Sequence, residues 1–275
     1  MTIREVLKQA AARLDDAGVP NGDYDAAVML AHVLGEDALM LRMNSWKQMP
    51  QDKLEEYESI LARREKREPM PYILGSTGFM GLDFHVEPGV LCPRPDTEIL
   101  CEEALRRLMP GARVLDIGTG SGALAVSIAK LGKDCSVTAV DVSDTALRVA
   151  QGNAERNGVQ VRFVKSDCFT ALEGEKFDMI VSNPPYISRE EMAQLMPEVL
   201  QEPELALFGG EDGLDFYRRI SREAGAYLNE GGCLLFEIGW LQKDAVSALL
   251  AEYIGKPFAL KDYGDNWRVV GAIYS

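Results

Sequence analysis

The chain has 275 residues, of which 47% are hydrophobic and 26% are charged, enough apolar content for one large domain with a small one. Lys and Arg total 29 against 43 Asp and Glu, which gives a formal net charge of -14. Because the summed field repels polyanions, non-specific nucleic-acid binding is disfavoured as the main activity.

The cysteines and the N-terminal segment indicate the compartment. The five cysteines are odd in number, lie far apart and show no paired metal-ligand spacing, so we expect reduced thiols, with neither disulfides nor zinc. Residues 1–13 are amphipathic, and no segment approaches the ~20 apolar residues that span a bilayer. These features predict a soluble, cytoplasmic protein that makes no membrane contact.

The N-terminal quarter of the chain is predicted to be helical. Thr2-Ile3-Arg4-Glu5 is a capping-box pattern, and the apolar residues that follow it have helical spacing as far as Gly18. Similar spacing recurs after the turn at Pro20 and again after Pro50. We therefore predict a helical domain over residues 1–70.

The sequence pattern changes after residue 70. Glycines divide short apolar runs such as Leu82–Val86, which is typical of a β-hairpin. We predict a hairpin connector over 71–92. From Arg113 onward, apolar strands alternate with helical patterns as far as the final run Trp267–Tyr274, so residues 93–275 are predicted to form an α/β domain with a mostly parallel, Rossmann-like sheet.

A glycine-rich loop follows the first strand of this domain, Val114–Ile117. It reads Gly118-Thr119-Gly120-Ser121-Gly122 and opens a helix at Ala123. Glycine lets the backbone approach a ligand closely, and a helix N-terminus presents unpaired N–H groups to it. The spacing differs from the dinucleotide fingerprint and lacks a Walker lysine, so a tight turn without a ligand remains the alternative.

Acidic residues end the next two strands. Asp141 stands about 20 residues after the loop, where a carboxylate can accept both hydroxyls of a ribose. Its alternative role is a helix N-cap, although Ser143 and Asp144 are better placed for one. Asp167 and Cys168 end the third strand, where they would lie beside an adenine or form an ordinary polar loop.

Together, the run Val114–Gly122, the strand-end Asp141 and Ser166-Asp167 resemble the successive binding motifs of class I S-adenosylmethionine-dependent methyltransferases. The resemblance implies S-adenosylmethionine as cofactor. It also implies that the three strand ends hold its methionine, ribose and adenine portions in order, with Asn183 completing the cofactor site.

The fourth strand ends in Asn183-Pro184-Pro185-Tyr186, on the edge where open α/β sheets bind ligands. The two prolines stiffen the turn. A planar NH2 group could donate to the Asn183 side-chain oxygen and the Pro184 carbonyl while Tyr186 packs against its plane. The motif resembles the catalytic signature of methyltransferases that act on planar amino or amide nitrogens. The residues alone leave adenine and glutamine open, and a rigid turn is the structural alternative.

The segment from Phe79 through Pro93-Arg94-Pro95-Asp96-Thr97-Glu98 closely resembles the HemK/PrmC family of release-factor glutamine methyltransferases, as do Ser182–Ile187 and Glu202–Leu207. The resemblance covers nearly the whole chain from residue 70. The family usually has Glu where Asp96 stands and an apolar residue where Cys92 stands, so the roles of those two side chains stay open.

This resemblance implies methyl transfer to the Gln side-chain amide in the Gly-Gly-Gln loop of class-one release factors. The helical domain would bind the release factor, and we expect a monomer without direct nucleic-acid contact. By residue type alone Arg94 and Glu98 could form a surface salt bridge; the resemblance implies that they line the pocket roof. The alternatives are a glutamine methyltransferase acting on a ribosomal protein, a DNA adenine methyltransferase, and a non-catalytic adaptor of translation factors.

Overall fold

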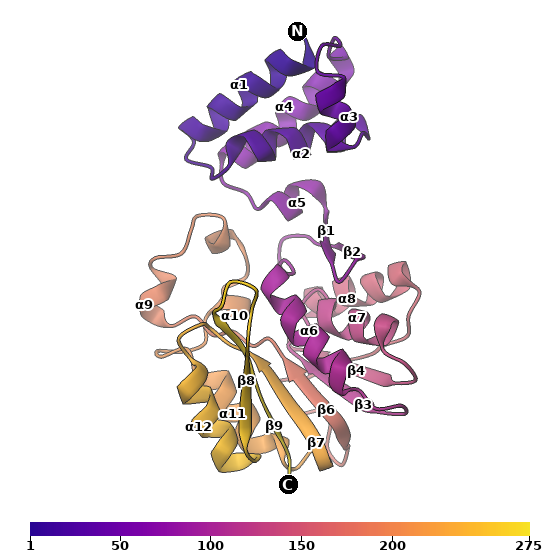
Figure 1. Ribbon diagram of the computed structural model, residues 1–275, viewed down its shortest axis with the longest axis vertical. Helices are drawn as coiled ribbons and strands as arrows, with labels where there is room; N and C mark the ends of the chain where they lie inside the picture. Colours follow the sequence, from indigo (N-terminus) through magenta and orange to yellow (C-terminus); the bar gives the residue numbers. More distant parts are fainter. The chain divides into compact units, whose positions relative to one another are not determined.

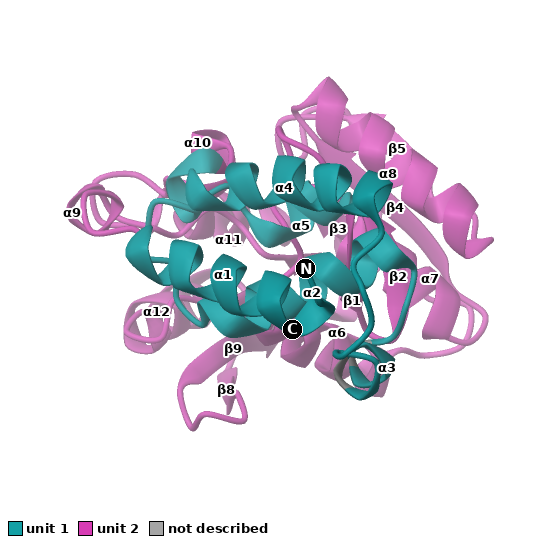
Figure 2. Ribbon diagram, turned by 90° about the horizontal axis from the view of Figure 1, so that it is seen from above, with its two compact units in different colours: residues 1–75, 196–201 teal, residues 76–195, 202–275 magenta. Residues whose placement is uncertain are grey.

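The computed structural model describes residues 1–275, except for the side chains of Ala38 and Arg42. Two compact units divide the chain, one of residues 1–75 and 196–201 and the other of residues 76–195 and 202–275 (Figure 2). None of the described helices is long and apolar enough to cross a membrane.

The first unit is helical, as the sequence predicted. Its helices are α1 (Ile3–Asp16), α2 (Gly22–Leu34), α3 (Ala38–Met43), α4 (Gln51–Glu65) and α5 (Met70–Leu74). The expected capping box at Thr2 and Glu5 opens α1. Leu14, Leu30 and Leu61 are fully buried in a common core. The apolar spacing seen in the sequence therefore forms the face on which these helices pack.

Residues 196–201, which lie late in the sequence, belong to this helical unit. The Glu198 carboxylate accepts hydrogen bonds from Arg67 at 2.6 and 2.7 Å and pairs with Arg64 at 3.1 Å. Arg64 is itself buried and donates to Asp25 at 2.8 Å. A shared set of charges around the buried Arg64 thus ties α4, α2 and the 196–201 segment together.

The second unit begins with the antiparallel hairpin of β1 (Ser76–Phe79) and β2 (Leu82–His85). A seven-stranded sheet follows, in the order β5-β4-β3-β6-β7-β9-β8. Its strands are β3 (Arg113–Ile117), β4 (Ser136–Asp141), β5 (Arg162–Lys165), β6 (Phe177–Ser182), β7 (Leu228–Glu237), β8 (Pro257–Lys261) and β9 (Trp267–Ile273). The first five are parallel, and β9 pairs antiparallel with both β7 and β8.

Helices cover both faces of this sheet (Figure 1). One face packs against α6 (Pro95–Arg107), α7 (Ala123–Leu131) and α8 (Asp144–Asn157), and the other against α11 (Asp215–Ala224) and α12 (Lys243–Tyr253). Two one-turn helices, α9 (Arg189–Met192) and α10 (Glu204–Leu207), lie between β6 and α11, with a 3-10 turn at Val199–Gln201.

The strand order fixes where a ligand can bind. From β3 the chain moves outward through β4 to β5, then returns to the other side of β3 and continues through β6 to β7. The strand order therefore reverses between β3 and β6, and a crevice opens outside their carboxyl ends. The predicted Rossmann-like sheet, with a helical N-terminal domain and a hairpin before it, is confirmed.

Candidate active site

A cavity lies at this reversal, within the second unit. Its wall includes the glycine loop after β3 and the ends of β4, β5 and β6; the predicted residues on it are Arg94, Gly118, Thr119, Gly120, Ser121, Asp141, Asp167, Cys168, Asn183, Pro184 and Pro185. The cavity is open to solvent, and one wall joins the glycine loop to the Asn183 turn. A cofactor at the loop and a substrate side chain at Asn183 would therefore lie in the same cavity.

The glycine loop needs glycine for its backbone conformation. Gly118 and Gly120 have φ values of +73° and +55°, and a Cβ on either would meet no heavy atom within 4 Å. Their missing side chains leave open space on the loop, which is the cradle that a closely approaching ligand requires. Gly122 differs, because a Cβ there would lie 2.9 Å from the Cβ of Ala150; it allows α7 and α8 to pack closely.

Asp141 joins the ends of two strands. Its two carboxylate oxygens accept from the backbone N–H groups of Gly120 and Ser143, each at 2.9 Å. Ser143 is the N-cap of α8, because its hydroxyl accepts from the Ala146 N–H. Ser143, and not Asp141, is therefore the N-cap of α8. Each carboxylate oxygen keeps a lone pair for a ligand in the cavity.

Just after β5, Asp167 is exposed, and its Oδ1 accepts from Arg219 at 2.6 Å. Cys168 is buried with φ of +51°. Burial raises the pKa of the Cys168 thiol to about 11. This cysteine is therefore a neutral, apolar part of the cavity wall at physiological pH.

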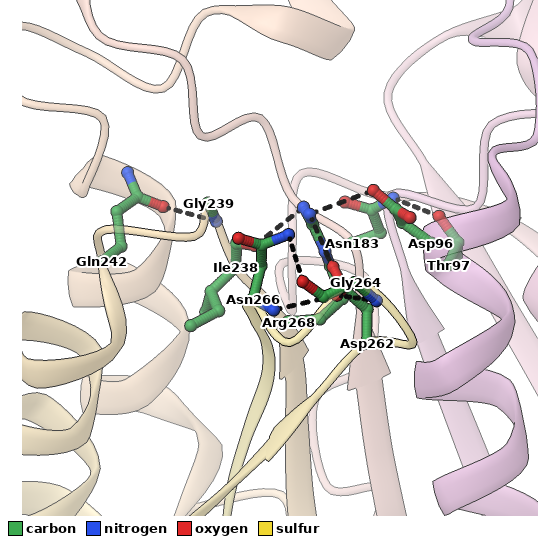
Figure 3. Close-up of polar contacts among 10 residues, drawn as sticks. All are labelled: Asp96, Thr97, Asn183, Ile238, Gly239, Gln242, Asp262, Gly264, Asn266 and Arg268. Atoms are coloured by element: carbon green, nitrogen blue, oxygen red, sulfur yellow. Dashed lines mark hydrogen bonds and ion pairs between the residues drawn. The ribbon is translucent and has the colours of Figure 1, made fainter.

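The Asn183 amide is held by one end. Its Nδ2 donates to the hydroxyl of Thr97 on α6, at 3.1 Å, as Figure 3 shows. Pro184 is buried, and Asn183 and Pro185 are partly exposed. Because the donor end of the amide is occupied, its acceptor end, Oδ1, remains for a group in the cavity.

Tyr186 is placed differently from the other members of the tetrapeptide. Its ring packs against the core under α11 and α12, and it does not line the cavity that the described residues form. The side chain of Gln242 donates to the Tyr186 carbonyl at 2.9 Å and accepts from the Gly239 N–H at 3.0 Å. This arrangement fixes the turn that follows Asn183.

Arg94 and Glu98 lie apart from each other. Arg94 lines the cavity and forms an ion pair with Glu202, a buried residue that also accepts from the Cys92 N–H. Glu98 does not line the cavity among the described residues; its carboxylate accepts from the Met80 N–H at 2.6 Å. Glu98 therefore fixes the hairpin onto α6.

No role was assigned from the sequence to several residues that organise this site, although some of them, Arg268 and Asp262 included, match the pattern of the family that the chain resembles. Thr97 was read only as part of a motif, yet it holds Asn183. Arg268 of β9 pairs with Asp96 at 3.0 Å and with Asp262 at 3.1 Å (Figure 3). Glu237 is a buried carboxylate at the end of the apolar run Cys233–Phe236 of β7. That last feature is a signal in the sequence, because a buried charge in a strand needs a partner or a purpose.

Known proteins resemble both parts of the chain. Residues 81–210 match the family model of the methyltransferase small domain, and residues 5–75 match that of the PrmC N-terminal domain. A release factor glutamine methyltransferase of Geobacter sulfurreducens is 45% identical over 98% of this chain and 96% of its own. Another, of Clostridium acetobutylicum, is 42% identical over 99% of both chains.

Solved structures agree with the fold. The crystal structure of a methyltransferase from Pyrococcus furiosus has a TM-score of 0.56 and 26% identity, covering 71% of this chain and 89% of its own. The human Mettl16 catalytic domain has a TM-score of 0.55 at 18% identity, covering 71% of this chain and 76% of its own, and shows the fold alone.

The sheet, the glycine loop and these likenesses define a class I methyltransferase, an enzyme that uses S-adenosylmethionine, as the sequence predicted. Within that class, the chain belongs to the release factor glutamine methyltransferase family.

Proposed function

We propose that this enzyme transfers a methyl group from S-adenosylmethionine to the side-chain amide nitrogen of the Gln in the Gly-Gly-Gln loop of class-one peptide-chain release factors. The observation that carries the proposal is the Asn183 amide, whose donor end is bound to Thr97 beside the glycine loop. An acceptor is thereby left where a planar NH2 group would enter. Membership of the family selects glutamine over adenine.

The cavity residues fit the cofactor. The open cradle at Gly118 and Gly120 would take its methionine portion, the Asp141 carboxylate its ribose hydroxyls, and the wall at Asp167 and Cys168 its adenine. Thr119 and Ser121, also on the wall, would complete the loop's contacts. When bound, S-adenosylmethionine supplies an electrophilic methyl group on a positively charged sulfur.

The chemical difficulty lies in the acceptor. An amide nitrogen is a poor nucleophile because its lone pair is delocalised, as the ~18–20 kcal/mol rotation barrier of the C–N bond shows. Two acceptors, Asn183 Oδ1 and the Pro184 carbonyl, would bind the amide protons more strongly as positive charge develops on nitrogen. As the N–C bond forms and the C–S bond breaks, one of these protons leaves the nitrogen for solvent.

The buried Pro184 and the anchored Tyr186 turn support this role through rigidity. Holding a nitrogen in line with a methyl group can contribute roughly 7–11 kcal/mol in favourable systems. We include Pro185 and Arg94 in the substrate-binding wall. Glu98 would act there only indirectly, through the hairpin that it holds.

The helical unit is the proposed binding region for the release factor. It exposes large apolar side chains: Tyr24, Leu39, Met40, Met43 and Trp46. Exposed apolar groups clustered in a short stretch are typical of protein interaction surfaces. The net charge of -14 argues against nucleic acid as the partner. We propose that the enzyme acts as a cytoplasmic monomer.

One labelling experiment separates the candidate substrates. S-adenosylmethionine labelled on its methyl group is offered with a release factor, the same factor with its loop Gln changed to Ala, a large-subunit ribosomal protein, and duplex DNA. Label on the release factor that depends on the loop Gln supports the proposal. Label on the ribosomal protein or DNA alone points to those alternatives, and absence of cofactor binding would support a non-catalytic adaptor.

A further inference from the structure

Glu237 and Asn183 end neighbouring strands at the same edge of the sheet. In the parallel pairing of β6 with β7, Ser182 lies opposite Phe236. The residues that come next are Asn183 and Glu237, so these two lie next to each other where the paired strands end. The Glu237 carboxylate is therefore carried directly beside Asn183, the proposed acceptor for the substrate amide.

The side of the sheet on which Glu237 lies follows from alternation. Along β7, Leu235 belongs to the core under α6, whereas Phe236 and Ile238 belong to the core under α11 and α12. Successive side chains of a strand point to opposite faces. Glu237 thus lies on the face that α6 covers, and Thr97 is the third residue of α6.

Both residues are buried. Glu237 is 1% exposed and Thr97 is 5% exposed. The Thr97 hydroxyl lowers the pKa of the Glu237 carboxyl, as a hydrogen-bond donor beside it does, and the carboxyl oxygen Oε2 has no partner among the described atoms. The same hydroxyl accepts from Asn183 Nδ2 at 3.1 Å.

A threonine hydroxyl has a single proton to donate. An ionised carboxyl at Glu237 can only accept, so it takes that proton and leaves the hydroxyl oxygen to accept from Asn183. We propose that Glu237 is a positioning residue that acts through Thr97 to set which end of the Asn183 amide faces the cavity. This inference rests on the function proposed above.

Protonation of Glu237 would reverse the chain of hydrogen bonds. A neutral carboxyl can donate to the Thr97 oxygen, and the hydroxyl is then free to donate to Asn183. The amide would turn its oxygen toward Thr97 and its NH2 group toward the cavity. Two NH2 groups would then face each other, and the substrate amide would lose its acceptor.

The groups around Glu237 bring the pKa of its carboxyl near neutral pH. Burial raises the pKa of Glu237 to about 7, against the opposing effects of Thr97, Arg268 and Arg94, and Asp96 raises it further. Arg268 is already paired with Asp96 and Asp262, and Arg94 with Glu202.

Two tyrosines also lie nearby. Burial raises the pKa of Tyr186, and raises that of Tyr217 well above its ordinary value. Both phenols therefore stay neutral over the range in which Glu237 titrates. Tyr217 donates its own proton to the Glu237 backbone carbonyl, at 2.8 Å.

The test is the pH profile of methyl transfer to the release factor at saturating cofactor, between roughly pH 6 and pH 9. For the wild type we expect kcat to fall below about pH 7, approaching tenfold per pH unit. Glu237→Gln should lose this acid limb, because no proton is left to bind. Thr97→Val should lower kcat by about 100-fold above about pH 7, as misplaced catalytic groups do, with the cofactor Kd unchanged. It should also lose the acid limb, because Glu237 then has no hydroxyl through which to act on Asn183.

Two further variants serve as controls. Thr97→Ser keeps the hydroxyl and should keep both the rate and the acid limb. Asp116→Asn removes another buried carboxyl, whose pKa burial also raises to about 7; the acid limb should remain in this variant.

An acid limb that persists unchanged in Glu237→Gln overturns the positioning role, and so does wild-type kcat in Thr97→Val. Should Glu237→Gln fail to fold, Thr97→Val decides alone. Wild-type enzyme that transfers no methyl group to the loop Gln at any pH contradicts the proposed function instead, so the two failures are distinguishable.

Discussion

The Asp141 carboxylate accepts a hydrogen bond from the Gly120 N–H across 2.9 Å, and so connects the end of β4 to the glycine loop that follows β3. One acidic side chain thereby shapes the loop and faces the cavity at the same time. Cofactor binding should depend on it in both ways.

Replacing Asp141 with Ala should weaken S-adenosylmethionine binding at least about tenfold, since charge-assisted hydrogen bonds contribute ~1.5–3 kcal/mol each. Isothermal titration calorimetry measures the change. Asp144→Ala is the matched control, because Asp144 is exposed and pairs with Lys165 at the surface. An unchanged Kd in the Asp141 variant would show that the ribose assignment is wrong.

Asn183→Ala removes the proposed acceptor for the substrate amide and should lower kcat by about 10²–10³, the effect of deleting one transition-state hydrogen bond. Cofactor affinity should change little. Asn229→Ala provides the control, as Asn229 binds Asp178 at the opposite end of β7. Full activity of the Asn183 variant in the labelled-methyl assay would refute the mechanism.

Two glycine variants should move stability in opposite directions. At Gly122, φ is +83° and a Cβ would lie 2.9 Å from that of Ala150, so Gly122→Ala should destabilise the second unit by roughly 1–3 kcal/mol. Gly152 lies inside α8 with nothing within 4 Å of a Cβ, so Gly152→Ala should stabilise it by about 0.5–1 kcal/mol. Thermal denaturation compares the two, and equal shifts would contradict the packing argument.

The sequence predicted the elements with strong periodicity and omitted those without it. The alternating strands and helices from β3 to β6 were expected. The helix α11 was not, because half of its ten residues are charged, although Tyr217, Ile220 and Ala224 share a buried face. β8 begins with Pro257 at the edge of the sheet, and its residues are only partly buried, so it has little apolar pattern to detect.

The residues of the site likewise divide into those that the sequence could predict and those that it could not. Residues at strand ends were predictable, since parallel strands bring their carboxyl ends to one edge. The pairing of Thr97 with Asn183 was not, because 86 residues separate them and the contact depends on how α6 packs over the sheet. Glu98 has the residue type expected of a pocket wall, and only the structure shows its bond to Met80.

Arg64 should be essential to the helical unit. It is 6% exposed and donates to Asp25, so Arg64→Ala leaves a buried carboxylate unpaired, at a cost of about 3–5 kcal/mol. Hydrogen exchange should accelerate in α2 and in residues 196–201, which Glu198 links to the same guanidinium. Lys53→Ala breaks an exposed pair with Glu56 and should change neither. Equal exchange in both variants would refute this dependence.

Asp116 should make the second unit less stable as pH rises. The residue is fully buried and its Oδ1 has no partner among the described atoms; burial raises its pKa from 3.8 to about 7. Between those two values the folded state binds more protons than the unfolded state, so the free energy of unfolding falls with pH until about pH 7 and then levels off. Asp116→Asn removes this titration.

Urea denaturation between roughly pH 5 and pH 8 measures the effect. As pH rises, the free energy of unfolding of the wild type should fall relative to that of Asp116→Asn. This holds whichever of the two proteins is more stable at any single pH. Glu237 contributes in the same direction, because burial raises its pKa to about 7 as well. The double variant with Glu237→Gln should therefore have the flattest profile, and parallel curves for wild type and Asp116→Asn would show that Asp116 does not titrate in this range.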